Sequence, residues 1–198
     1  MTSSNPNGGG IMQDSLKAGR ILVFVARMFA SPLEACLRTD FGPKYFGFAA
    51  LAALALMPLW MAFWPDKSST PLTGFWIYVL LMFARARAES GRMLRDGTNV
   101  HSRSNGISRL SRWFPRMAEA KVKAKVEPGF CFIMGILLMY LSEPLGSFVL
   151  IATVGLVLAQ STIDSVERAR VMELNDALIE QQSIAERFRE MQRNQSRR

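Results

Sequence analysis

Cysteine and histidine are scarce in this chain of 198 residues, which has two cysteines and one histidine. Two cysteines, Cys36 and Cys131, are too few to build a disulfide framework. A single histidine, His101, cannot form a histidine metal cluster, and no cysteine or histidine spacing is of the zinc-binding type. We therefore expect neither a metal nor a cofactor.

Catalytic motifs are also missing. His101 lies in a polar segment with serines and acids nearby, but nothing there resembles a nucleophile elbow or a spaced catalytic pair. No catalytic residue and no small-molecule substrate can be identified. The prediction is that the protein is not an enzyme.

Charge is missing from two long stretches of the chain. Residues 46–64 are 19 consecutive residues without an ionisable side chain, and Glu143 is the only charged residue in 128–160. An α-helix of 19 residues is about 28 Å long, close to the roughly 30 Å thickness of the hydrocarbon core of a bilayer. This segregation predicts a membrane protein, although the overall hydrophobic content of 49% is ordinary.

Proline and polar turns divide the apolar stretches into two helical hairpins with four predicted membrane spans. The second hairpin turns at Ser142-Glu143-Pro144, and its arms are so short that a re-entrant hairpin, which does not cross the bilayer, is the alternative. The segments PLTGFW at 71–76 and PLGSFV at 144–149 are similar. They favour a duplicated hairpin, although any short hairpin favours such residues at its turn.

The predicted fold is an all-α membrane protein with an N-terminal interfacial helix and a long C-terminal cytoplasmic helix. We expect Ser31-Pro32 to interrupt the first helical region, and the alternating sequence at 120–126 is typical of a strand, although its residues also favour helix. The expected segments are a disordered leader (1–10), an amphipathic interfacial helix (11–42), a first transmembrane hairpin with a cytoplasmic helical extension (43–97), a basic cytoplasmic loop (98–127), a second hairpin (128–160) and a cytoplasmic helix (161–198).

Basic residues are concentrated in one region. Residues 85–127 contain eleven bases and four acids, an excess of +7 within a net charge of +8. The only base in the turns of the two hairpins is Lys67. Lysine and arginine stay on the cytoplasmic side of membrane proteins. We therefore predict that both termini and the central loop are cytoplasmic, and that the membrane is a bacterial inner (plasma) membrane.

The basic loop has several interpretations. It serves as a topology determinant, contacts anionic lipid or binds an acidic partner. Binding to nucleic acid is not expected, because loop bases alone are a weak signal. The residues assigned to lipid or acidic-partner contact are Arg103, Arg109, Arg112, Arg116, Lys121, Lys123 and Lys125.

The C-terminal helix carries a stripe of residues at alternating spacings of three and four, which is typical of a short coiled coil. This stripe predicts binding to a protein partner or to a second copy of the chain; the alternative is an amphipathic helix packed on the same protein. The stripe consists of Val171, Leu174, Leu178, Gln181, Ala185 and Phe188. Gly155 and Ala159 are small residues at a spacing that favours helix packing.

The leading functional hypothesis is a non-enzymatic integral membrane scaffold or assembly component. Such a protein would recruit a partner through its cytoplasmic helix and basic loop, as in a bacterial secretion or conjugation apparatus. The alternative is a small transporter or channel subunit that acts as an oligomer. The predicted spans, however, lack the ionisable residues that transporters usually keep there.

Overall fold

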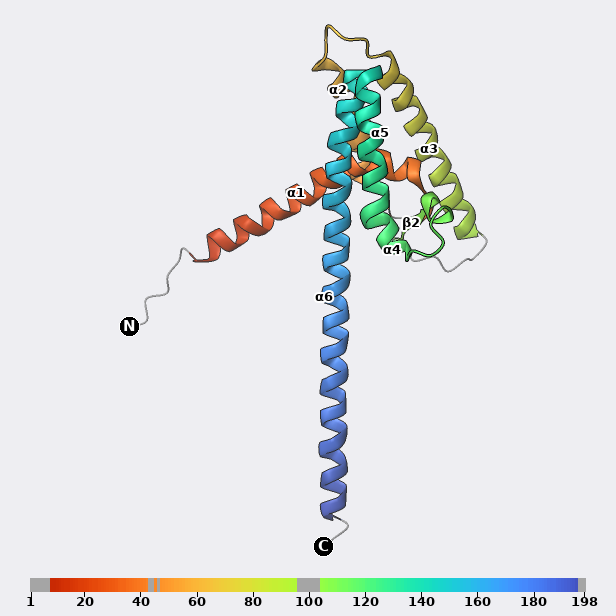
Figure 1. Cartoon of the computed structure of the whole chain (residues 1–198). Helices are drawn as coiled ribbons and strands as arrows, with labels where there is room; N and C mark the ends of the chain where they lie inside the picture. The colour runs from red at the N-terminus through yellow and green to blue at the C-terminus, as the bar shows by residue number, and fades with distance from the viewer. Residues whose placement is uncertain (1–7, 43–44, 46, 96–103, 196–198) are drawn as a thin grey trace. The chain divides into compact units, whose positions relative to one another are not determined.

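The computed structural model describes residues 8–42, 45, 47–95 and 104–195, which are mostly helical (Figure 1). The chain divides into two compact units, Met1–Gln160 and Ser161–Arg198. The predicted all-α class is therefore confirmed. The predictions for residues 1–7, for His101 and for Arg103 lie outside the described residues.

The first helix, α1 (Gly8–Leu37), is continuous, so the disorder predicted for residues 8–10 and the break predicted at Ser31-Pro32 are wrong. The Ser31 hydroxyl donates to the Arg27 carbonyl oxygen at 2.6 Å, a bond that bends helices and so suits the kink that proline requires. Pro32 is fully buried. The second half of α1 belongs to the core, which corrects the expectation of a helix that lies only at a surface.

Two short strands follow from distant parts of the sequence. Strand β1 (Arg38–Phe41) pairs antiparallel with β2 (Asn105–Ser108), with Thr39 opposite Ile107. Gly106 has a φ of +76°, and a Cβ there would lie 2.6 Å from the carbonyl oxygen of Thr39. Only glycine therefore fits this close approach. The sequence predicted a helix at β1 and did not anticipate this ladder.

Four further helices are the predicted apolar ones: α2 (Phe48–Ala62), α3 (Thr70–Arg95), α5 (Glu127–Leu141) and α6 (Glu143–Gln195). Within the described residues, two helical segments are long and apolar enough to cross a membrane, Glu119–Leu141 and Glu143–Arg189. Helix α2 is apolar but shorter. Ser142, with an extended backbone, separates α5 from α6, as predicted.

The turns that connect α2 to α3 and α5 to α6 lie at the same end of the first unit (Figure 1). Lys67 Nζ of the first turn lies 2.9 Å from Glu143 Oε1 at the start of α6. Both side chains are about half exposed, so this ion pair marks the proximity of the two turns and contributes little to stability.

The segment before α5 is helical in three short pieces, which makes the strand predicted at 120–126 wrong. A 3₁₀ turn, η1 (Arg109–Arg112), is followed by α4 (Glu119–Lys121) and the π-helical turn η2 (Val122–Val126), which continues directly into α5. Alanine, lysine and glutamate are good helix formers, and here this propensity outweighs the alternating pattern.

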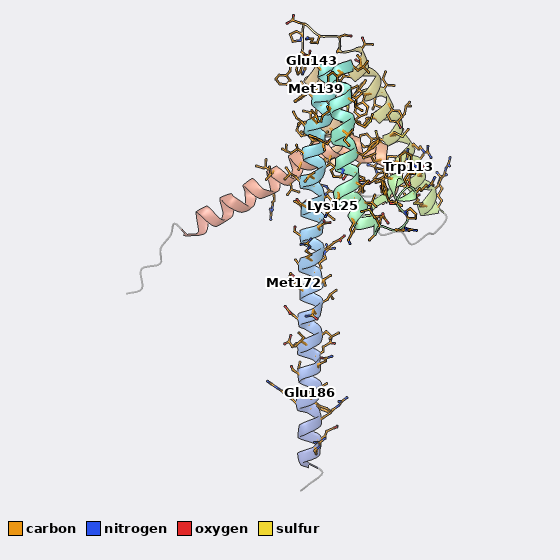
Figure 2. All side chains as sticks on the ribbon, viewed as in Figure 1. Trp113, Lys125, Met139, Glu143, Met172 and Glu186 are labelled. Atoms are coloured by element: carbon orange, nitrogen blue, oxygen red, sulfur yellow. The ribbon has the colours of Figure 1, made fainter. Side chains whose placement is uncertain are left out.

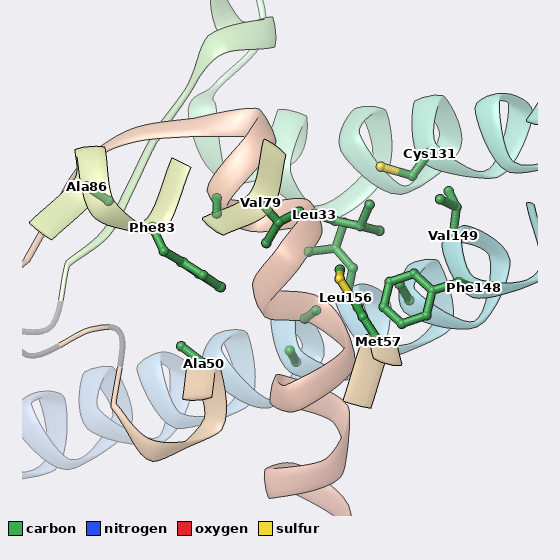
Figure 3. Packing of buried hydrophobic residues seen from close by; sticks show 14 of the residues in the cluster. Leu33, Ala50, Met57, Val79, Phe83, Ala86, Cys131, Phe148, Val149 and Leu156 are labelled. Atoms are coloured by element: carbon green, nitrogen blue, oxygen red, sulfur yellow. The ribbon is translucent and has the colours of Figure 1, made fainter. Parts of the chain in front are cut away.

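The core of the first unit lies where α1, α2, α3, α5 and α6 meet (Figure 3). Met57 of α2, Val79 of α3 and Leu156 of α6 are fully buried. The rings of Phe75 and Phe148 lie edge to face, with centroids 6.4 Å apart. These two phenylalanines occupy equivalent positions in the similar segments 71–76 and 144–149.

Candidate functional site

A buried arginine, Arg38 at the start of β1, lies between the carboxylates of Glu34 and Glu127. Arg38 donates to Glu127 Oε2 from Nε at 2.9 Å and from Nη2 at 2.7 Å, and from Nη1 to Glu34 Oε1 at 3.3 Å. Arg38 Nη2 also donates to Gln160 Oε1 at 3.4 Å. The Tyr45 hydroxyl donates to Glu34 Oε2 at 2.9 Å. We call these five residues the arginine cluster.

The arginine cluster gathers residues from across the first unit. Glu34 lies in the last turn of α1, Arg38 begins β1 and Tyr45 precedes α2. Glu127 is the first residue of α5, and Gln160 lies on α6. The side chains of Arg38 and Glu127 are 0% exposed, so water does not screen their ion pair. The cluster therefore ties the N-terminal region to α5 and α6.

The net effect of burial and neighbouring charges keeps Arg38 and Tyr45 of the arginine cluster protonated. Burial acts to lower the pKa of Arg38, but Glu34 and Glu127 outweigh it and hold that pKa above its usual value. Burial and the charge of Glu34 raise the pKa of Tyr45, so its hydroxyl stays a hydrogen-bond donor. Arg38 binds only Oε2 of Glu127, and the described residues provide no hydrogen-bond partner for Oε1. The arrangement suits a permanent structural tie.

The surface contact predicted for Lys123 is wrong. This residue was assigned to lipid or to an acidic partner, but it is buried, and its Nζ donates to Asn105 Oδ1 at 3.0 Å and to the Gly106 carbonyl oxygen. Glu119 Oε1 lies 2.6 Å from the same ammonium group. Lys123 thus ties η2 to β2 and is not available at the surface.

Of the other described bases that were assigned to lipid or acidic-partner contact, all but one lie at the surface. Arg109 is half-buried, whereas Trp113, beside the exposed bases, is 74% exposed (Figure 2). Leu110 is buried. The exposed bases are Arg112, Arg116, Lys121 and Lys125.

Of Gly155 and Ala159, for which the sequence predicted helix packing, Gly155 faces α1. A Cβ at Gly155 would lie 2.7 Å from Phe29 Cβ and 2.8 Å from the Ala26 carbonyl oxygen. Ala159 is 1% exposed. The sequence did not indicate that α1 would be the neighbour at this position.

The second unit carries the stripe predicted to bind a partner. Every described side chain from Ser165 to Arg189 is exposed, and these include all six stripe residues. Figure 2 shows the side chains of this part of α6, with Met172 and Glu186 labelled. Further large apolar side chains on the same segment are exposed, namely Val166, Met172, Ile179 and Ile184. The apolar surface is therefore wider than the stripe.

The two cysteines lie inside the first unit. Cys131 is buried, and burial, opposed by Arg109, raises the pKa of the Cys36 thiol to about 12. A thiol with so high a pKa carries almost no thiolate near neutral pH and is a poor nucleophile. Among the described residues, no group of three His, Cys, Asp or Glu side chains could hold a metal ion.

The arginine cluster was missed by sequence reasoning. Glu34 and Arg38 are four residues apart on a predicted helix, a spacing that favours an ion pair and was visible in the sequence. Glu127 stands directly before an apolar run, but its partner Arg38 is 89 residues away.

Comparisons with models of protein families, with curated proteins and with solved structures find no match for this chain. The function must therefore be argued from the residues and their geometry.

Proposed function

We propose that this protein is a non-enzymatic integral membrane scaffold that recruits a partner protein, or a second copy of itself, through the second unit. The observation that carries the proposal is the exposed apolar surface between Val171 and Phe188 on α6. Large exposed apolar patches mark interaction sites in folded proteins.

The apolar surface of α5 supports the location in a membrane. Only 22% of the apolar stretch within Glu119–Leu141 is buried, so most of its side chains face outward. Water would make this arrangement unfavourable, whereas hydrocarbon would solvate it. The large side chains exposed on α5 are Phe130, Phe132, Ile133, Ile136, Leu137, Met139, Tyr140 and Leu141.

The common end of the two helical turns supports a four-span topology. If α2 with α3 and α5 with α6 each cross the bilayer as a hairpin, the contact between Lys67 and Glu143 requires both turns to emerge on one side. The basic segment between the hairpins and both termini then share the other side. The excess of lysine and arginine assigns that side to the cytoplasm, in a bacterial inner membrane.

The stripe on α6 supports the choice of a helical partner. Val171, Leu174 and Leu178 occupy the core positions of a heptad pattern, and burying one such leucine contributes about 1.5–3 kcal/mol. Gln181 and Ala185 occupy later core positions and would weaken a dimer of identical helices. A helix from another component of an assembly, such as a secretion or conjugation apparatus, is therefore the favoured partner.

The exposed bases near α4 support a second contact on the same side. Arg112, Arg116, Lys121 and Lys125 are available to anionic lipid or to an acidic partner surface. Each such base contributes about 1 kcal/mol near an anionic leaflet. These residues would hold the segment before α5 at the membrane surface.

Crosslinking in native membranes tests the partner surface. A photoreactive amino acid placed at Leu174 or Leu178 of the full-length chain should give a crosslinked product. The same residue at Asp176 or Ser183, which lie on the opposite side of the helix, should not. Equal products from both pairs of positions, or none from Leu174 and Leu178, would contradict the proposal.

A further inference from the structure

A cavity of about 450 Å³ opens between α1 and the start of α2 in the first unit. Its lining includes two arginines, Arg20 and Arg27, together with Phe24, Phe48, Glu34 and Tyr45. This volume lies within the range of small-molecule sites in proteins. None of the functions considered above uses the cavity.

One face of α1 forms the longer wall of the cavity. Arg20, Phe24, Arg27, Ser31 and Glu34 follow one another at spacings of three or four residues, so they share that face. Arg20 and Arg27 are two turns apart, about 10 Å along the helix. Their long side chains can converge on one anionic group between them.

The sign of the charge in the cavity is positive. Glu34 also lines it, but both of its carboxylate oxygens are engaged, one with Arg38 and the other with Tyr45. The guanidinium carbon of Arg27 lies 5.3 Å from the centroid of the Tyr45 ring, a contact that orients this arginine. An anion in the cavity would meet two guanidinium groups and one carboxylate whose oxygens are bound to Arg38 and Tyr45.

The rest of the wall is apolar. The rings of Phe24 and Phe48 stack with centroids 6.0 Å apart, and Val23, Ala49 and Ala50 also line the cavity. Phe48 is 75% exposed. A ligand that has an anionic group and a long apolar part matches both kinds of wall.

We propose that this cavity binds an anionic glycerophospholipid, with its phosphate between Arg20 and Arg27 and its acyl chains along Phe24 and Phe48. The uncapped start of α2 at Gly47 adds the positive end of a helix dipole on the same side. The inference rests on the proposed membrane location. Arginine suits phosphate because its guanidinium donates two parallel hydrogen bonds.

Native mass spectrometry of the purified full-length protein, titrated with lipid, tests the site. Phosphatidylglycerol should bind more tightly than phosphatidylcholine, whose headgroup amine balances its phosphate. Arg20→Gln and Arg27→Gln should each weaken phosphatidylglycerol binding about fivefold, whereas Arg27→Lys, which keeps the charge but not the paired hydrogen bonds, should weaken it less. Arg116→Gln, the same charge change in the exposed basic segment, is the matched control and should leave binding unchanged.

Three results would overturn the proposal. The first is equal affinity for the two lipids. The second is unchanged lipid binding in Arg20→Gln and Arg27→Gln variants that keep the thermal transition of the native protein. The third is displacement of the lipid by millimolar inorganic phosphate. The last result would mean that the cavity binds phosphate without the lipid.

Carbonate extraction of the native membranes used for crosslinking separates a failure of the lipid site from a failure of the proposed membrane scaffold. A protein that stays in the membrane and crosslinks through Leu178, yet shows no lipid preference, lacks only the lipid site. A protein that carbonate releases is not integral to the membrane, and both the membrane location and the lipid site would then be wrong.

Discussion

Arg38 is the residue on which most of the buried polar contacts depend. It carries the positive charge between Glu34 and Glu127, and both acids are almost completely shielded from water. Taking charges out of water is costly, and the attraction between them compensates only while every partner is present. The loss of the arginine would leave two buried carboxylates unpaired.

Replacing Arg38 therefore tests whether the arginine cluster stabilises the first unit. Arg38→Met should lower the free energy of unfolding by about 3–5 kcal/mol, because it breaks a buried ion pair. Thermal unfolding of the purified protein in detergent measures the effect. Arg85→Met is the matched control, because Arg85 pairs with Glu89 while 59% exposed, and such surface pairs contribute little to stability.

A combined variant makes this prediction independent of the loss of side-chain volume. Arg38→Met together with Glu34→Gln and Glu127→Gln removes all three charges and should recover much of the lost stability. If Arg38→Met destabilised no more than Arg85→Met, or if the combined variant were the least stable, the cluster would not act as a charge-paired tie.

Residue types alone showed only part of this site. The spacing of Glu34 and Arg38 is visible in the sequence, and so is the isolated acid at Glu127. Their meeting depends on how α1, β1 and α5 fold together, which no local pattern encodes. Lys123 shows the reverse case, because a lysine in a basic segment looks like a surface residue until β2 is placed beside it.

At the scale of elements, the packing of α6 against α1 depends on Gly155. Gly155→Ala should lower the free energy of unfolding by about 1–3 kcal/mol, because the added methyl group would overlap backbone atoms of Ala26 and Ala30, which cannot move aside easily. Thermal unfolding in detergent is again the measurement.

Gly91 provides the matched control for this substitution. It lies within α3, and a Cβ there would meet no atom within 4 Å. Gly91→Ala should therefore be neutral or stabilise the protein by up to about 1 kcal/mol, through helix propensity. If Gly155→Ala were as well tolerated as Gly91→Ala, the close approach of α1 and α6 would not be required.

The elements that the sequence predicted are those with a strong local signal. Runs without charge, bounded by Pro71, Pro128 and Pro144, indicated the positions of α3, α5 and α6. The strands β1 and β2 have four residues each and come from distant segments, so neither shows a pattern of its own. Helix α1 continues past Pro32 because that residue is buried in the folded unit, and the sequence alone does not show this burial.

At the scale of the whole molecule, the proposed topology leads to a labelling experiment. In a chain with Cys36→Ala and Cys131→Ala, a membrane-impermeant maleimide should label Ser68→Cys from outside intact cells. Arg112→Cys and Ser183→Cys should be labelled only after the membrane is opened, because the basic segment and the second unit are predicted to be cytoplasmic. All three positions are exposed in the structure.

The outcome at Ser68 also separates spanning from re-entrant hairpins. The turn that contains Ser68 and the turn before α6 are linked by Lys67 and Glu143, so both should be reached from the same side. Labelling of Ser68→Cys only after the membrane is opened would contradict four spans. The sequence predicted the side of each segment from the distribution of lysine and arginine alone, so the labelling experiment also tests that prediction.

The arginine cluster has a consequence for biosynthesis. Arg38 is translated 89 residues before Glu127 and 122 residues before Gln160. When α1 leaves the ribosome, the groups that will bury Arg38 do not yet exist, and the helix must wait in a hydrated or headgroup environment. The arginine cluster can therefore form only after Gln160 has been made, so folding of the first unit must finish with a late step that brings Arg38 to α5 and α6.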